Sequence, residues 1–363
     1  MTILELTKQL VRIPSITSDQ AQCKLALDII AELFATDTFI IERFEHEGIH
    51  SLIVKNFDGQ RADVCFNGHI DVVPPQTTEQ REPTERDGLL YGRGAGDMKD
   101  GIALISLLMK DLCTQQTVTK KLMLMITADE EIWGKNGVKH LTEQWYGGDI
   151  VLIPDGGNRQ EIVIGEKWVI NLTLTATGKA GHSSRPWKYE NAIEKLYLAY
   201  TTIKERIETP ELQHAPDHRW CSVQLTTITG GLASNMIPGE ATGTLNIRYT
   251  EVTTYERIIR CIEESIWSLG DITMAVDMRG GVLFTDPTHR VIKQYQTIAE
   301  KHLWTVSLTK EHGASDGRFF AEKWAVVLLQ KPTCFDIHGA DERTTIAELE
   351  EIYAVYKEFV LSV

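Results

Sequence analysis

The sequence predicts an α/β protein in which a mixed sheet flanked by helices is interrupted by an inserted ferredoxin-like α+β domain. Short apolar runs such as KLMLMIT (121–127) and DIVLIP (149–154) alternate with helical patterns, which is typical of strands buried on both faces of a sheet. From about residue 170 these runs give way to apolar–polar alternation, as in VINLTLTAT (169–177). Such alternation is typical of strands with one exposed face, so a second kind of sheet is expected there.

Two stretches of the chain, one on each side of this middle region, carry the elements of the larger sheet. The first begins with helical spacing of Ile3, Leu6 and Leu10, which ends before Pro14. Further helices are predicted at residues 21–35, 99–112, 287–302 and 347–361, and strands at 39–44, 51–56, 62–68, 121–127, 149–154 and 325–329. We therefore predict that the two outer stretches build a single sheet.

The middle region has a different order of elements. Strands are predicted at residues 169–177, 222–229, 241–249 and 273–277, and helices at 190–208 and 255–268. This is the β-α-β-β-α-β order of the ferredoxin-like arrangement. We expect a discontinuous larger domain, residues 1–171 and 281–363, and a smaller inserted domain, residues 172–280.

Composition restricts the possible functions. The chain has 363 residues, of which 42% are apolar and 24% charged, as in ordinary globular proteins. Acidic residues outnumber basic ones by 51 to 37, so neither nucleic acids nor anionic membranes are expected partners. No apolar run approaches the roughly 18 residues that a membrane-spanning helix needs. The six cysteines form no C-x-x-C pair and the N-terminal region lacks signal-peptide features, so we expect a cytoplasmic protein.

Polar residues follow several of the apolar runs. His69 and Asp71 come directly after the strand at 62–68, although an H-x-D alone is also common in polar turns. Asp97 follows the G-x-G-x-G stretch at 92–96 and precedes a helix. The glycines suggest a phosphate loop, but carboxylates at this point repel phosphate. Two interpretations remain for Asp97, a helix cap and a carboxylate that faces a cation.

Three adjacent acids, Asp129, Glu130 and Glu131, follow the strand at 121–127. On a surface they are merely a solvated patch. At the end of a buried strand, a divalent cation is the simplest way to offset their mutual repulsion. Such a cation leaves one glutamate free to act as the base for an attacking water.

Two further groups complete the pattern. Asp155 follows the strand at 149–154, and His338 lies in the late segment DIHGADE (336–342). With the residues above, five strand ends are expected to present imidazole and carboxylate groups at one edge of one sheet. These ligands suit zinc, cobalt or manganese, so the sequence predicts a metal site.

The motifs GHIDVVPP, GRGAGDMKDG, TADEE and PDGG, together with His338, resemble the M20 family of metallopeptidases and deacylases. They recur in the family's order over essentially the whole chain. Within the family they resemble the succinyl-diaminopimelate desuccinylase and acetylornithine deacetylase group. The resemblance implies amide hydrolysis in a zinc-aminopeptidase-like catalytic domain that holds two metal ions. It also implies that the inserted domain is a lid and dimerisation module.

The resemblance implies a role for each residue of the metal site. Asp97 is expected to bridge two zinc ions, with His69 and Asp155 as ligands of the first and Glu131 and His338 as ligands of the second. Asp71 is expected to orient the imidazole of His69. Glu130 is expected to act as the general base that takes a proton from the attacking water and passes it to the leaving amine.

Family motifs also occur in the inserted domain. GKAGHSS (178–184) matches a motif whose histidine, here His182, assists the oxyanion in the partner's active site; the alternative is a surface turn histidine. SNMIPG (234–239) and Arg248 match a second motif, which implies that Asn235 and Arg248 contact the substrate or its carboxylate. The alternative for Arg248 is an ion pair with an acid of the same domain.

A further motif, ASDGRF (314–319), resembles a desuccinylase stretch that lines the substrate pocket. It implies substrate contacts for Ser315 and Arg318, with a structural role as the alternative for Arg318.

Departures from the desuccinylase pattern concern the substrate. Those enzymes usually carry Glu at the position of Asp155, where Asp is common in the peptidase branches, and Gly at the position of Asp100. We expect a deacylase-type enzyme that hydrolyses an amide bond in a small N-acyl amino acid or short peptide, with an M20-type dipeptidase or carboxypeptidase as the alternative. A non-catalytic metal-binding scaffold is a remote third possibility, because every candidate position is filled. The expected partners are a small-molecule substrate and a second copy of the chain.

Overall fold

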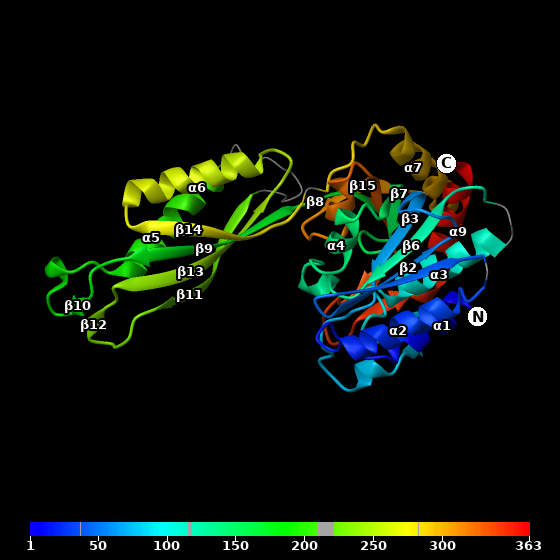
Figure 1. Ribbon diagram of the computed structural model, residues 1–363, viewed down its shortest axis with the longest axis horizontal. Helices are drawn as coiled ribbons and strands as arrows, with labels where there is room; N and C mark the ends of the chain where they lie inside the picture. Colours follow the sequence, from blue (N-terminus) through cyan, green and yellow to red (C-terminus); the bar gives the residue numbers. More distant parts are fainter. Residues whose placement is uncertain (37, 115–117, 210–220, 282) are drawn as a thin grey trace. The chain divides into compact units, whose positions relative to one another are not determined.

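A computed structural model describes residues 1–36, 38–114, 118–209, 221–281 and 283–363 (Figure 1). The chain divides into two compact units. The first comprises Met1–Gly165, Leu283–Glu311 and Ser315–Val363, and the second comprises Glu166–Val282 with His312–Ala314. The role of the second unit as a lid and dimerisation module stays a prediction.

The first unit is built on an eight-stranded mixed sheet, in the order β1-β2-β6-β3-β7-β16-β8-β15. Its strands are β1 (Ile40–His46), β2 (Ile49–Lys55), β3 (Arg61–His69), β6 (Leu122–Thr127), β7 (Gly147–Ile153), β8 (Glu161–Glu166), β15 (Ser307–Glu311) and β16 (Val326–Leu329). Both β15 and β16 come from the later stretch of the chain, and β16 pairs in parallel with β7. The prediction that the two outer stretches build one sheet is therefore confirmed.

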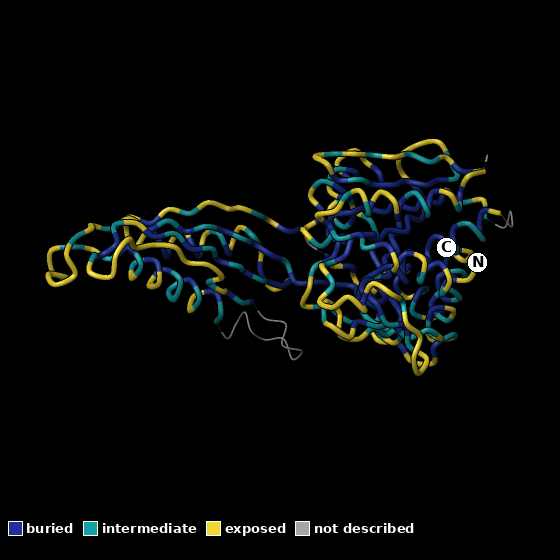
Figure 2. Tube along the Cα trace, turned by 90° about the horizontal axis from the view of Figure 1, so that it is seen from below, coloured by how far each residue is buried: buried dark blue, intermediate teal, exposed yellow. Residues whose placement is uncertain are grey.

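Both faces of this sheet are covered by helices. On β6, Leu122, Leu124 and Ile126 belong to one core, whereas Met123 and Met125 belong to the opposite one. The helices of the first core are α1 (Ile3–Val11), α2 (Gln20–Glu32), α3 (Lys99–Thr114), α7 (Arg290–Leu303) and α9 (Ile346–Ser362); those of the second are α4 (Val138–Glu143) and α8 (Gly317–Ala321). Burial on both faces explains why the central strands have continuous apolar sequences. Figure 2 shows buried segments of the trace in the interior of the first unit.

Local side chains fix where the helices begin. Thr2 and Glu5 form a reciprocal capping box at α1, and Asp19 accepts a hydrogen bond from the Gln22 N–H at the start of α2. The α7 helix begins later than predicted, because the His289 ring caps it. Among the described residues, no helix has the combined length and apolarity that crossing a membrane requires.

A small four-stranded sheet of the first unit gave no recognisable pattern in the sequence. Its order is β17-β18-β5-β4, with the bounds β4 (Thr84–Arg86), β5 (Leu89–Tyr91), β17 (Cys334–Phe335) and β18 (Arg343–Thr345). Strands of two or three residues are too short to display an alternation period, so they were not predicted. The short helices α4 and α8 and the strands β8 and β15 were likewise not predicted.

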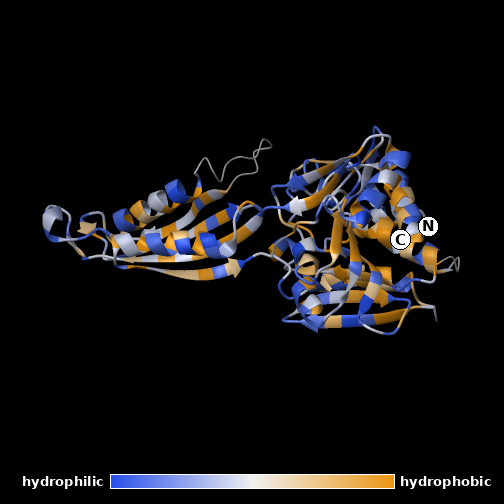
Figure 3. Ribbon diagram, turned by 90° about the horizontal axis from the view of Figure 1, so that it is seen from above, coloured by the Kyte–Doolittle hydropathy of each residue, from blue (hydrophilic) through white to orange (hydrophobic). Residues whose placement is uncertain are grey.

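The second unit contains a four-stranded antiparallel sheet in the order β11-β13-β9-β14. Its elements are β9 (Trp168–Thr177), α5 (Ala192–Ile207), β11 (Ser222–Gly230), β13 (Glu240–Tyr249), α6 (Tyr255–Leu269) and β14 (Ile272–Arg279), with a small pair β10 (Gly181–His182) and β12 (Met236–Ile237). Leu172 and Leu174 of β9 lie in the core with α5 and α6, whereas Thr173 and Thr175 are only partly buried. Hydrophobic and hydrophilic residues accordingly interleave along these elements (Figure 3). The main elements follow the predicted β-α-β-β-α-β order.

The double-sided burial of β6 predicts a large cost for truncation. Leu124 is 0% exposed, so Leu124→Ala should lower the free energy of unfolding by about 2–5 kcal/mol through lost apolar burial and the cavity left behind. Urea denaturation followed by circular dichroism measures the change. Leu25→Ala on α2, at a side chain 48% exposed, is the control, with an expected cost below about 1 kcal/mol. Equal losses in the two variants would contradict the burial of β6.

Candidate metal centre

Parallel strands position three of the five candidate metal ligands. The carboxyl ends of β6, β3, β7 and β16 lie at one edge of the main sheet. His69 is the last residue of β3, Glu131 lies just after β6, and Asp155 lies just after β7. Loops beyond the carboxyl ends of parallel strands are where α/β proteins place ligand sites.

Asp97 and His338 reach this edge by another route. The expectation that both stand at strand ends of the main sheet is wrong. Asp97 lies between β5 and α3, and His338 lies between β17 and β18. Because β18 pairs with both β5 and β17, the small sheet holds the loops that carry the two residues.

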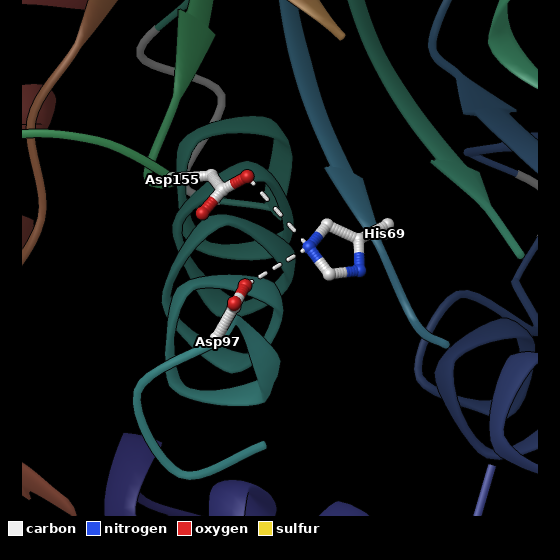
Figure 4. Close-up of side chains that lie close together, drawn as sticks. All are labelled: His69, Asp97 and Asp155. Carbon is white, nitrogen blue, oxygen red and sulfur yellow. Dashed lines mark hydrogen bonds and ion pairs between the residues drawn. The ribbon is translucent and has the colours of Figure 1, made fainter. Parts of the chain in front are cut away.

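The first candidate ligand group consists of His69, Asp97 and Asp155 (Figure 4). The His69 Nε2 atom lies 3.2 Å from Asp97 Oδ1 and 3.6 Å from Asp155 Oδ2. The His69 Nδ1 atom lies 2.9 Å from the main-chain oxygen of Asp71. An Nδ1–H donated to that oxygen leaves the lone pair of Nε2 directed at the two carboxylates, as metal ligation requires.

The second candidate group consists of Asp97, Glu131 and His338. The His338 Nε2 atom lies 3.0 Å from Asp97 Oδ2 and 3.1 Å from Glu131 Oε2. The other Glu131 oxygen accepts a hydrogen bond of 3.2 Å from the Val73 N–H. Within each group the ligand atoms lie within 4.8 Å of one another, and Asp97 presents one oxygen to each group.

Opposite charges at this centre displace the pKa values of its residues. Burial lowers the pKa of His69, but hydrogen bonds to carboxylates, Asp155 first, raise it well above the ordinary value. Hydrogen bonds to Asp97 and Glu131 raise the pKa of His338 to about 10. Burial raises the pKa of Asp97, yet the two imidazoles outweigh this effect and hold it well below the ordinary value. The carboxylates of this buried site thus strongly favour positive charge beside them.

Glu130 lies beside the first group but belongs to neither candidate group among the described residues. Its Oε2 lies 4.0 Å from His69 Nε2. Burial raises the pKa of Glu130 well above the ordinary value, and the charges of Asp316 and Asp155 act in the same direction. Glu130 is therefore a more basic carboxylate than a solvated glutamate.

Asp71 organises the site through more than the imidazole. Its main-chain oxygen is closer to His69 Nδ1 than its carboxylate, which lies 3.4 Å away. The Asp71 carboxylate accepts a hydrogen bond of 2.7 Å from the Thr17 hydroxyl and bonds of 3.3 Å from the main-chain N–H groups of Glu130 and Glu131. Asp71 therefore positions the two glutamates as well as His69.

Two acids near the centre face other partners. Asp129, the first of the three adjacent acids, accepts the main-chain N–H groups of Asn136 and Gly137 at 2.8 and 3.0 Å. Asp100 accepts a hydrogen bond of 2.7 Å from the Thr344 hydroxyl, and burial raises the pKa of Asp100 to about 7. Neither acid belongs to a candidate ligand group among the described residues.

The sequence alone indicates no role for the buried ion pair of Glu342 and Arg93 or for the buried Lys331, which support the centre. The carboxylate of Glu342 pairs with Arg93 and accepts three main-chain N–H groups at 2.8–3.2 Å, from Gly94, Gly96 and Asp97. Arg93 also donates to the main-chain oxygens of His338 and Gly339. The same ion pair thus fixes both loops of the small sheet that carry candidate ligands.

Lys331 supports the centre separately from this ion pair. It donates to Asp155 Oδ1 at 3.3 Å and to the main-chain oxygen of Gly96 at 3.2 Å. Burial lowers the pKa of Lys331, but nearby negative charge, that of Asp155 first, raises it above the ordinary value. Lys331 follows Leu329 of β16 at the same offset as Asp155 follows Ile153 of β7, and this offset is the sequence signal that could have identified it.

Ser315 and Arg318, predicted to bind substrate, are both buried. Arg318 is 2% exposed, and its guanidinium donates to the main-chain oxygens of Ser315 and Trp133. The Ser315 hydroxyl accepts a hydrogen bond of 3.1 Å from the Gly317 N–H. These contacts favour the structural alternative for Arg318.

The remaining predicted residues lie in the second unit. His182 of β10 pairs with Met236 of β12, and the main-chain oxygen of Asn235 accepts the Ser183 N–H at 3.0 Å. The side chains of His182 and Asn235 are exposed. Arg248 of β13 donates to Asn246 Oδ1 at 3.2 Å. Contacts of His182, Asn235 and Arg248 with substrate stay predictions.

The donor set of the two groups fits divalent metal ions. Each group offers one imidazole nitrogen and two carboxylate oxygens, a combination that zinc, cobalt and manganese all accept. The contact between His69 Nδ1 and a main-chain oxygen is the outer support usual for a metal-ligating imidazole. Positive charge placed here would also offset the repulsion among the buried carboxylates.

Comparison with known proteins agrees with this geometry. Residues 65–362 match Peptidase family M20/M25/M40. A succinyl-diaminopimelate desuccinylase from a Nitratiruptor species is 30% identical over 383 residues, and the match covers 100% of both chains. A tripeptidase from Staphylococcus aureus has a TM-score of 0.81 at 20% identity, covering 99% of this chain and 97% of its own. A dinuclear metal-binding peptidase of the M20 family from Bacillus subtilis has a TM-score of 0.70 at 14% identity, with coverage of 99% and 97%. The solved structures share the fold, and the sequence matches show that this chain is a hydrolase that belongs to peptidase family M20/M25/M40.

Proposed function

We propose that the protein is a metal-dependent deacylase that hydrolyses the amide bond of a small N-acyl amino acid with a free carboxylate. The observation that carries the proposal is the position of Asp97, whose two oxygens face His69 on one side and His338 on the other. A carboxylate shared in this way supports a bridging role between two ions. The full-length similarity to a desuccinylase supports deacylation as the reaction class.

The metal of this proposal is zinc, with cobalt and manganese as alternatives that the same donors accept. When bound, two such ions polarise the scissile carbonyl and make an attacking water more acidic. The His69–Asp97–Asp155 group would hold one ion and the Asp97–Glu131–His338 group the other.

Glu130 supplies the proton transfer in this scheme. Its carboxylate accepts a proton from the attacking water and then donates it to the nitrogen of the leaving amine. Burial raises the pKa of Glu130, and this suits both steps. The carboxylate is a better base than a solvated glutamate, and the carboxylic acid that forms keeps its proton long enough to donate it to the amine. Glu131 accepts a hydrogen bond from the Val73 N–H and lies next to His338. We therefore assign the role of metal ligand to Glu131 and the role of base to Glu130.

We also propose that the second unit serves as a lid and that the protein is a homodimer located in the cytoplasm. His182 would assist the oxyanion in the partner's active site, and Asn235 and Arg248 would bind the substrate, with Arg248 suited to its carboxylate. The exposure of the His182 and Asn235 side chains supports their availability for such contacts. All six cysteines are unpaired, which supports a reducing compartment.

A peptidase acting on dipeptides or as a carboxypeptidase is the second candidate function. Asp155 favours it, because Asp at this position resembles the peptidase branches of the family. The same metal ligands and the same base serve both reactions, so only the substrate separates the candidates.

The decisive experiment is a substrate panel with zinc-loaded protein. The panel comprises N-succinyl-diaminopimelate, N-acetylornithine, other N-acyl amino acids and dipeptides, and primary-amine release is the readout. We expect an N-acyl amino acid to be turned over far faster than any dipeptide. Preference for a dipeptide would favour the peptidase over the deacylase. No amine release from any substrate, with two zinc ions bound, would favour a non-catalytic scaffold.

The role of Glu130 can be separated from that of the ligands. Glu130→Gln should lower kcat at least about 100-fold, because the amide cannot accept the proton of the attacking water. Metal content measured by mass spectrometry should remain at two ions per chain of the variant.

The matched control is Glu131→Gln, which should lose one of the two ions because a candidate ligand is removed. If instead Glu130→Gln loses metal while Glu131→Gln keeps it, the roles of base and ligand are reversed.

His182→Ala should lower kcat about 100-fold or more without changing metal content, because one oxyanion donor is lost. Mixed dimers of Glu130→Gln and His182→Ala chains test whether His182 acts across the dimer. They should recover up to one working site per dimer, because the chain with an intact Glu130 receives His182 from its partner. Activity no higher than that of the parent variants would show that His182 does not act on the partner.

A further inference from the structure

Lys331 stands in register with two candidate ligands. Leu329 of β16 pairs with Ile153 of β7 in parallel, and Leu152 of β7 pairs with Phe66 of β3. Continuing both registers beyond the strand ends places Lys331 beside Asp155, and Asp155 beside His69. A lysine, an aspartate and a histidine therefore form one row across three neighbouring parallel strands.

The contacts of Lys331 fix the orientation of Asp155. Its ammonium donates to Asp155 Oδ1 at 3.3 Å, so this oxygen is engaged. The other oxygen, Oδ2, lies 3.6 Å from His69 Nε2, on the side of the first ligand group. A second hydrogen bond, to the main-chain oxygen of Gly96, ties the same ammonium to the loop that carries Asp97. The Lys331 side chain is only 6% exposed, so solvent screens this charge weakly.

The acids around Lys331 explain how its charge is tolerated in the interior. Asp155 contacts the ammonium directly, and Asp97, Asp100 and Glu311 lie near enough to interact with it electrostatically. A buried charge needs such partners. The same arrangement lowers the affinity for a metal ion beside Asp155. The ion is repelled by the charge of Lys331 and has to share the Asp155 carboxylate with the Lys331 ammonium.

We propose that Lys331 is a positioning residue for Asp155, and that its charge makes the His69–Asp97–Asp155 group the weaker of the two metal sites. The inference rests on the proposed metal centre. Among the described residues, Lys331 makes its ion pair with Asp155 of the first group and acts on the second group through the charge of the shared Asp97, so the Asp97–Glu131–His338 group fills first. Lys331 thus directs Asp155 toward the first group while keeping the affinity of that group low.

The test is a titration of the metal-stripped protein with Zn²⁺ and, separately, Co²⁺, in competition with a chromophoric chelator. The wild-type protein should bind two ions with unequal affinity. Lys331→Met keeps the apolar stem and removes the charge, so the weaker site should tighten about 10- to 100-fold, the scale of changes at residues that support metal ligands. The tighter site should change less than about threefold.

Two variants identify the cause of the tightening. Lys331→Gln keeps a hydrogen-bond donor to orient Asp155 but removes the charge, so it should tighten the weaker site at least as much as Lys331→Met does. Lys55→Met is the matched control, because Lys55 is also a buried lysine, paired with Glu42 and located at the opposite end of β2 and β6. It should leave both affinities unchanged.

The outcomes separate this inference from the proposed function. If two ions bind but Lys331→Met leaves the weaker site unchanged or weakens it, the inference is overturned and the metal centre stands. Wild-type affinity in Lys331→Gln would overturn the role of charge. If the wild-type protein binds no ion with residues of either group, the proposed metal centre itself fails. In His338→Ala, which removes a ligand of the tighter site, the remaining site should still tighten on Lys331→Met.

Discussion

The candidate metal centre depends on a buried carboxylate that belongs to neither ligand group. Glu342 binds the main-chain N–H groups of the loop that ends at Asp97, and it pairs with Arg93, which in turn holds the loop of His338. Charge-assisted hydrogen bonds of this kind are among the strongest in proteins. Asp97 belongs to both candidate groups. Neither group can therefore bind a metal ion with all its ligands unless this loop is fixed.

The composition of the loop makes this support necessary. Glycine has more conformational freedom than any other residue, and holding a glycine-rich loop in one conformation is therefore costly in entropy. At Gly94 the backbone has a φ of +83°, and a Cβ atom would lie 2.8 Å from Lys99 and 2.9 Å from Val72. Only glycine fits there without strain, so rigidity has to come from outside the loop, and Glu342 provides it.

Features with a strong local period could be predicted from the sequence, whereas contacts between distant residues could not. The continuous apolar run of β6 and the apolar–polar alternation of β9 predicted the two kinds of sheet. The types of residue that follow β3, β6 and β7 predicted most of the site. Asp97 and His338 were predicted as site residues, but their route to the site depends on strands too short to show a pattern. Glu342 acts on residues far away in the chain, and spacing contains no information on such pairs, whereas Lys331 could have been identified by its offset from β16. Arg318 was ambiguous because a buried and a ligand-binding arginine look alike in a sequence.

The insertion of the second unit between β8 and α7 also determines the order in which the parts of the site are synthesised. Chains fold from the N-terminus as they emerge from the ribosome, and His69, Asp97, Glu131 and Asp155 all precede the second unit. Lys331, His338 and Glu342 follow it. The acidic residues of the site are therefore synthesised before the residues that hold their loops in place. The centre can be complete only after β16 has joined the sheet. A chain that ends before β16 lacks both Glu342, which holds the loop of Asp97, and the candidate ligand His338.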